Sequence, residues 1–436
     1  MRKHLIKSLV FVIGLLYCTI SNAQFLMDMV DTTKETGKGL LNIYKKFDHL
    51  KISCYIQPQF QIAQSKGIPT FEGPDFNEEV NNRFLLRRSR LRFDYVHFEE
   101  NNTPGVQIAF QFDANERGFT LRDVWGRVFE NKYKLFSFTT GMFARPFGYE
   151  TNLSSSVRES PERGRMNQLL MKSERDLGAM ISLDARKKIS GLQYLKVDLG
   201  LFNGQGINAK GDFDNSKDVV ARVALKPYKI SKNITVSMGA SALMGGLLQN
   251  TKYVYYTSLE NGIKKILVDS AIDNKGKNAP RKYIGTDVQL KIKNRIGFTE
   301  LRAEFIAGKH AVLENSNTTP TSLVTDKNGY YIRNFNGAYF YFIQNIFSQK
   351  HQLVVKYDWF DPNSRTSKKD IGKVGSNFNS ADIKYNTLGL GYINHVSNNI
   401  KLTLYYAKVW NEKTQLTGYT KDVKDDVFTC RLQFWF

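Results

Sequence analysis

The chain has 436 residues, a formal net charge of +21 at pH 7 and an aromatic content of 13%. No long apolar run follows the N-terminus, which excludes a membrane protein built from helices, and three cysteines are too few for a disulfide framework. The large positive charge indicates an anionic partner.

The N-terminus has the pattern of a secretory signal peptide. A basic stretch at 1–7 precedes an apolar run at 9–16, and small residues stand at 21–23. The apolar run is well short of the roughly 20 residues that a membrane anchor needs. We therefore predict that residues 1–23 are removed on export, which lowers the net charge by three.

Segment 24–50 differs from the rest of the chain. Leu40, Ile43, Tyr44, Phe47 and Leu50 recur at helical spacing. We expect a short amphipathic helix over 38–50, on the periplasmic side of an outer membrane.

From residue 51 onward, apolar and polar residues alternate as they do in β-strands that have one apolar face. The last strand, "FTCRLQFWF", is typical, because it places an apolar face at the end of an exported chain. Sixteen such stretches occur: 51–64, 84–98, 106–113, 120–129, 135–148, 175–188, 192–204, 217–227, 234–246, 283–293, 300–309, 334–347, 351–362, 384–395, 400–410 and 428–436.

The connections between these stretches alternate between short and long. This rhythm, with an even number of strands, predicts an all-β protein: a transmembrane antiparallel β-barrel of about 16 strands over 51–436, in the outer membrane of a Gram-negative cell. Pro58 cannot donate to a ladder, so we expect a bulge or a frayed pairing there. Asn261-Gly262 and Asn328-Gly329 each predict a hairpin standing above the barrel.

A strand with arginines on one face needs an aqueous surface on that side. Arg88, Arg90 and Arg92 alternate with apolar residues, so we predict that all three point into the lumen of the barrel. The same alternation places Arg87 on the lipid face near the outer rim, where lipopolysaccharide phosphates could pair with it.

Other basic residues share the lumenal parity. Charges of both signs on this face could instead pair across the barrel wall and merely keep it solvated. The further candidates for an anion pathway are Arg127, Lys196, Arg222, Lys226 and Arg302.

The long connection 147–175 follows the fifth strand, where general porins fold a loop inward to narrow the channel. We expect it to place Arg158, Arg163 and Arg165 at a constriction, although an ordinary salt-bridged extracellular loop fits the same residues. Cys54 and Cys430, on the first and last strands, should lie close together once the barrel closes.

Four motifs carry a resemblance to a known family. "TGMFARPFGYETNLSSS", "RDLGAMISLD", "LGLFNGQGIN" and "VVARVALKP" are similar to the phosphate-selective porin O and P family, in a form common among Bacteroidetes, and the resemblance covers about 50–436. It implies a trimeric, anion-selective channel of sixteen strands with a lumenal arginine ladder, which the segment "RRSRLRF" matches here.

Two functions are compatible with these features. The first is passive diffusion of small anions, with phosphate or polyphosphate as the favoured class, through a homotrimer in contact with outer-membrane lipid and lipopolysaccharide. The second is a surface binding or structural barrel whose loops hold a partner. Six scattered histidines without metal-ligand spacing and a lone "GQG" indicate no enzyme, metal, cofactor or nucleic acid.

Overall fold

The computed structural model describes residues 49–187, 191–325 and 328–436. The predicted signal peptide lies outside these residues. So does the expected N-terminal helix, except for its last two residues: His49 lies in a turn and Leu50 begins the first strand.

Antiparallel strands make up most of the described chain. They are accompanied by one short α-helix, α2 (Arg165–Leu170), and by the 3₁₀ turns η2 (Leu192–Tyr194), η3 (Ile272–Asn274) and η4 (Ser380–Asp382). The strands are β1 (Leu50–Ala63), β2 (Asn82–Phe98), β3 (Pro104–Asn115), β4 (Gly118–Phe129), β5 (Phe136–Ala144), β6 (Arg175–Asp184), β7 (Leu195–Phe202), β8 (Asp218–Lys229), β9 (Ile234–Leu248), β10 (Val254–Glu260), β11 (Ile263–Asp269), β12 (Asn278–Lys293), β13 (Phe298–Val312), β14 (Tyr330–Ile346), β15 (Ser348–Asp361), β16 (Tyr385–Ser397), β17 (Ile400–Asn411) and β18 (Val427–Trp435).

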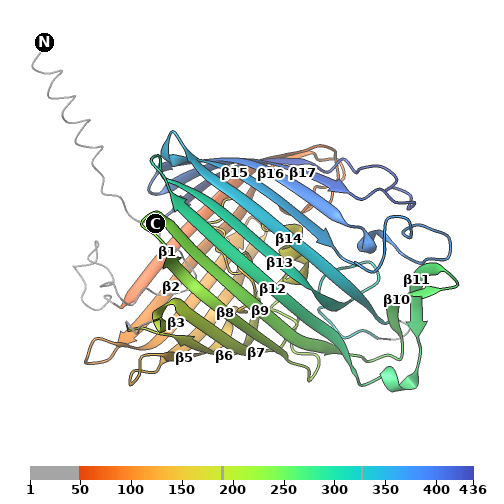
Figure 1. The fold of residues 1–436 in the computed structure, drawn as a ribbon, viewed down its shortest axis with the longest axis horizontal. Coiled ribbons are helices and arrows are strands. Elements are labelled where there is room, and N and C mark those ends of the chain that lie inside the picture. The colour runs from red at the N-terminus through yellow and green to blue at the C-terminus, as the bar shows by residue number, and fades with distance from the viewer. Residues whose placement is uncertain (1–48, 188–190, 326–327) are drawn as a thin grey trace, which may run out of the picture. The chain divides into compact units, whose positions relative to one another are not determined.

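Sixteen of these strands form one closed barrel. Each pairs antiparallel with its neighbour in the chain, β9 pairs with β12 across the β10–β11 hairpin, and β1 pairs with β18 to complete the circle (Figure 1). The predicted strand number and closed antiparallel fold are therefore confirmed. Among the described residues, no helix is both long enough and apolar enough to cross a membrane.

The outer surface of the barrel is an apolar belt. Alternate residues along the strands are exposed and large, for example Leu177 at 53%, Leu199 at 54% and Ile284 at 63%. Their neighbours in sequence point inward and are mostly buried. An exposed apolar face on every side is stable only against lipid, so the alternation that defines the strands also defines their membrane face.

The two Asn-Gly pairs behave differently. Asn261 and Gly262 have φ of 51° and 74° and close the β10–β11 hairpin, as predicted for a two-residue turn. The hairpin expected at Asn328-Gly329 is wrong, because 313–325 and 328–329 contain no strand. The chain after Gly329 instead extends β14, whose first residues pair in parallel with the edge of β10.

The largest apolar core lies inside the barrel. Phe147, Met166 and Leu170, from the connection between β5 and β6, pack among inward-facing side chains of the wall such as Tyr339 and Phe360. Part of the lumen is therefore filled by side chains that pack around this connection.

The predicted proximity of the two cysteines is wrong. Cys430 pairs with Phe60, whereas Cys54 exchanges backbone hydrogen bonds with Phe436, so six positions along the strand separate them. This offset is roughly 20 Å. Both thiols are free. The stagger of the closed barrel sets this register, and the positions of the cysteines within their own strands do not reveal it.

Candidate constriction and solute pathway

A β-bulge beside Pro58 changes the orientation of the arginine-rich strand. Ile56 pairs with Ser89 but Pro58 pairs with Leu86, so β2 carries one extra residue opposite β1. The bulge expected at Pro58 is confirmed. Its consequence is that both Arg87 and Arg88 reach residues inside the barrel, so the lipid-facing position predicted for Arg87 is wrong.

The connection 145–174, here called the inner segment, reaches the opposite wall of the barrel. Tyr55 Oη lies 2.7 Å from Ser155 Oγ, and Gln57 donates to the Ser155 carbonyl at 3.0 Å. Lys401 Nζ and Gln433 Nε2 both donate to the carbonyl of Ser156, at 2.7 and 2.9 Å. The segment that leaves β5 is thus fastened to β1, β17 and β18.

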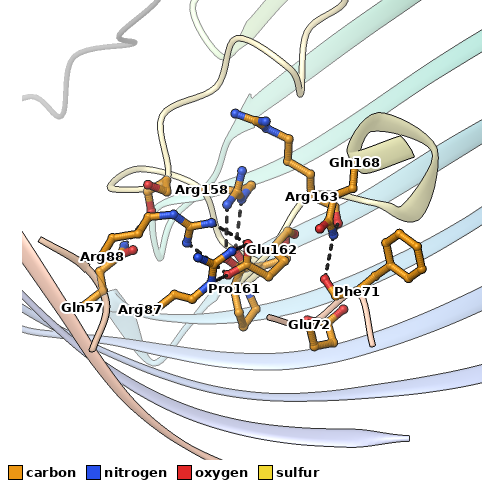
Figure 2. A network of polar contacts seen from close by, with 12 residues as sticks. Gln57, Phe71, Glu72, Arg87, Arg88, Arg158, Pro161, Glu162, Arg163 and Gln168 are labelled. Carbon is orange, nitrogen blue, oxygen red and sulfur yellow. Dashed lines mark hydrogen bonds and ion pairs between the residues drawn. The ribbon is translucent and has the colours of Figure 1, made fainter. Parts of the chain in front are cut away.

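Glu162 is the centre of this attachment (Figure 2). Its carboxylate accepts from Arg87 Nε at 2.9 Å, from Arg88 Nη1 at 3.0 Å and from Arg431 Nη2 at 2.9 Å. The Glu162 side chain is only 3% exposed. Burial by itself would raise its pKa, but the charges of Arg87, Arg88 and Arg431 outweigh burial and hold the pKa well below its usual range.

Two further carboxylates of the inner segment bind the wall. Glu159 forms a bidentate pair with Arg302, at 2.6 and 2.9 Å. Glu150 accepts from Lys356 Nζ at 2.8 Å. Burial opposes ionisation of Glu150, but Lys356, followed by Arg158, lowers its pKa to about 2. The buried Glu150 and Glu162 and the partly buried Glu159 therefore hold one connection against several strands.

The predicted ladder of arginines lines the inner face of β2, but its members are engaged by neighbours. Arg90 pairs with Asp113 at 2.9 Å and donates to Tyr55. Arg92 pairs with Asp94 at 2.7 Å. Arg90 and Arg92 therefore bind acidic side chains of the barrel wall, whereas Arg88 binds Glu162 of the inner segment.

Most of the other predicted pathway residues also have acidic partners. Arg222 binds Asp287 at 2.6 Å, while Arg127 donates to Thr139 at 2.8 Å and its guanidinium lies 4.8 Å from the Trp125 ring. The remaining pairs are Lys196 with Asp198 at 3.2 Å and Lys226 with Asp184 at 2.6 Å. These contacts fit the alternative in which wall charges pair with each other.

The three basic residues predicted for the constriction have different surroundings. Arg163 pairs with Glu174 at 3.0 Å. The Arg165 guanidinium lies between the rings of Phe71 and Tyr385, 4.2 and 3.6 Å from their centroids. The third, Arg158, donates to the backbone carbonyls of residues 160 and 161 at 3.4 and 3.1 Å, and within the described chain no carboxylate lies within 4.0 Å of it.

Lys401 was missed as a candidate. It is buried, donates to the carbonyls of Ser156 and Arg158, and has no carboxylate within 4.0 Å among the residues described. Lys401 lies on the same face of β17 as the inward-facing Thr403 and Tyr405, so the period-two alternation of the strand could have identified it. The role of Glu162 as a shared acceptor had no comparable signal, because its partners lie about 75 and 270 residues away in the chain.

A closed barrel of sixteen strands with a connection fastened inside is the fold of the outer-membrane porins. No family model matches the chain, and no curated protein matches its sequence. Three similar solved structures are OprB of Pseudomonas putida, DcaP of Acinetobacter baumannii and OmpT of Vibrio cholerae, with TM-scores of 0.54, 0.52 and 0.51.

Sequence identity to these three porin-fold proteins is low, at 10%, 11% and 9%. Each comparison covers 89% of this chain, and 94%, 97% and 99% of the other chain in the same order. The likeness therefore concerns the fold, and the resemblance to the phosphate-selective family stays a prediction.

Proposed function

We propose that the protein is a channel of the Gram-negative outer membrane through which small anions diffuse passively, with phosphate-like anions as the favoured class. The apolar belt and the closed barrel support the membrane location. The inner segment supports a narrow passage, since it crosses from β5 to β1, β17 and β18. A homotrimer fits this proposal, because the OmpT structure with the same fold is described as a trimer form.

The observation that carries anion preference is an imbalance of charge around the inner segment. Arg87, Arg88 and Arg431 share the single carboxylate of Glu162. Arg158 lies close enough to interact electrostatically with Glu162, with Arg88 and with Glu150, whose carboxylate is itself bound by Lys356. Four guanidinium groups thus surround one buried carboxylate, and Lys401 adds a further cation beside Arg158.

Such an excess of fixed cations favours anions for a physical reason. A small anion loses hydration when it enters a narrow passage, and guanidinium groups replace those contacts with charge-assisted hydrogen bonds. The planar fork of arginine also matches the oxygens of phosphate, and arginine keeps its charge at every relevant pH. The same fixed positive charges repel a cation that enters the passage.

The reversal potential of the purified protein in a planar bilayer, under a KCl gradient, tests this proposal. We expect the wild type to reverse toward the chloride equilibrium potential. The double variant R158A/K401A should reverse closer to zero, because it removes two cations that have no carboxylate partner. K408A is a matched control, since Lys408 is exposed on the outer face of β17. Cation preference in the wild type, or equal selectivity in wild type and double variant, would contradict the proposal.

One observation favours the alternative of a barrel with little transport. The inward-facing charged residues of β8, β12 and β13 are almost fully buried, with Arg222 at 4%, Asp287 at 6% and Glu304 at 2% exposure. In addition, an apolar cluster fills part of the lumen. A surface binding or structural role would then rest on the loops. Folded protein that inserts into the bilayer without any conductance step would support this second function.

A further inference from the structure

Two lysines face each other on the outer wall of the barrel. Lys282 of β12 and Lys309 of β13 are direct cross-strand partners. Both side chains are exposed, while Tyr283 and His310, the next residues along each strand, are buried inside. The alternation of the strands therefore turns both ammonium groups away from the lumen.

The pair lies at one edge of the apolar belt. Ile284, two residues further along β12, is 63% exposed, and Phe305 of β13 is 44% exposed. Met244, the partner of Lys282 on β9, is 60% exposed. Lys282 is close to the start of β12 and Lys309 is close to the end of β13, which is the side of the long connections. This is the extracellular side of the proposed channel.

No residue of the wall neutralises the two charges. Within the described residues, no carboxylate lies within 4.0 Å of either lysine. The strand partners on the far sides are Met244 for Lys282 and Asn334 for Lys309, and neither is acidic. Like charges directly opposite on adjacent strands destabilise a sheet. An anion between the two ammonium groups would replace this repulsion with charge-assisted hydrogen bonds.

We infer that Lys282 and Lys309 form a binding site for the phosphate of an outer-leaflet lipid of the lipopolysaccharide type. The inference rests on the proposed outer-membrane location, but not on anion transport. The phosphate accepts hydrogen bonds from both ammonium groups, and the acyl chains continue along Ile284, Phe305 and Met244. Lys408, whose strand partner is Leu388, lacks a second cation and does not form such a site.

The same inference relocates the lipid contact that the sequence suggested for Arg87. That residue lies inside the barrel and is held by Glu162. The outer wall of β12 and β13 offers the two-cation arrangement that phosphate recognition favours.

The test compares detergent-solubilised wild type with K282A/K309A and with the matched single control K408A. The probe is phosphorylated lipid A, with fully dephosphorylated lipid A and inorganic phosphate as separate arms, and binding is measured by native mass spectrometry. Each lysine should contribute roughly fivefold in affinity, so the double variant should bind phosphorylated lipid A about twenty-five-fold more weakly, and K408A should bind as the wild type does.

A second variant separates binding from folding. K309E replaces the repulsive pair with a Lys–Glu pair, so it should melt at the same temperature as the wild type or higher and still lose the phosphorylated lipid. Equal binding by wild type and K282A/K309A, or equal binding of dephosphorylated lipid A by the wild type, would overturn the site. Binding of inorganic phosphate alone would assign the pair to a soluble anion and would likewise overturn the lipid site. Anion selectivity in the bilayer is a separate readout, so failure of the site and failure of the channel are distinguishable.

Discussion

Replacing Glu162 with glutamine should release the inner segment without unfolding the barrel. The carboxylate accepts from Arg87, Arg88 and Arg431, and its side chain is 3% exposed, so solvent screens these contacts little. Removing one partner of a buried ion pair costs about 3–5 kcal/mol, because the remaining charge stays buried and uncompensated. The glutamine oxygen can still accept one hydrogen bond, which favours the lower end of this range.

A loss of about 3 kcal/mol increases the population of the released segment roughly a hundredfold. The barrel itself should persist, since the strand ladders do not involve this side chain. In planar bilayers, E162Q should show openings of higher conductance than the wild type. The reversal potential should also move further toward that of chloride, because one fixed anion is lost beside four arginines.

Limited proteolysis provides an independent measurement of release. Cleavage within 145–174 should accelerate in E162Q and remain slow in the wild type. E79Q is the matched control, because Glu79 forms an exposed pair with Lys66 and its side chain is 87% exposed. Identical conductance and identical protease resistance in E162Q and wild type would refute the reasoning that this carboxylate fastens the segment.

Two further predictions concern pH and strand register. The pKa of Glu150 is about 2 in the folded protein, below the ordinary value of about 4.3, so its attachment to Lys356 contributes fully above that ordinary value and is lost as the pH falls toward 2. Conductance should therefore stay constant from pH 8 to about pH 5 and rise in more acidic buffer, and a change between pH 5 and 7 would exclude this carboxylate as the cause. F60C should form a disulfide with Cys430 on oxidation, whereas native Cys54 should not, and mass spectrometry of the oxidised protein that found Cys54 joined to Cys430 would show that the β1–β18 register is different.

The sequence by itself determined the number, order and faces of the strands. Period-two alternation is a local property, since each residue's neighbours in the chain reveal which side meets lipid. For this reason the inward positions of Arg88 and Arg90 and the two-residue turn at Asn261 followed from short stretches. Pro58 predicted an irregularity in the strand pairing, because a residue without an N–H cannot take part in a regular ladder.

Only the tertiary structure decided what depends on distant segments. The bulge at Pro58 inserts one residue into β2 and so reverses the face of Arg87, which parity alone assigns to lipid. The stagger of the closed barrel places Cys430 opposite Phe60, because register between the first and last strands is set by every pairing around the circle. The convergence of Arg88 and Arg431 on Glu162 joins three parts of the chain, and an ion pair leaves no mark in sequence spacing when its partners meet only through folding.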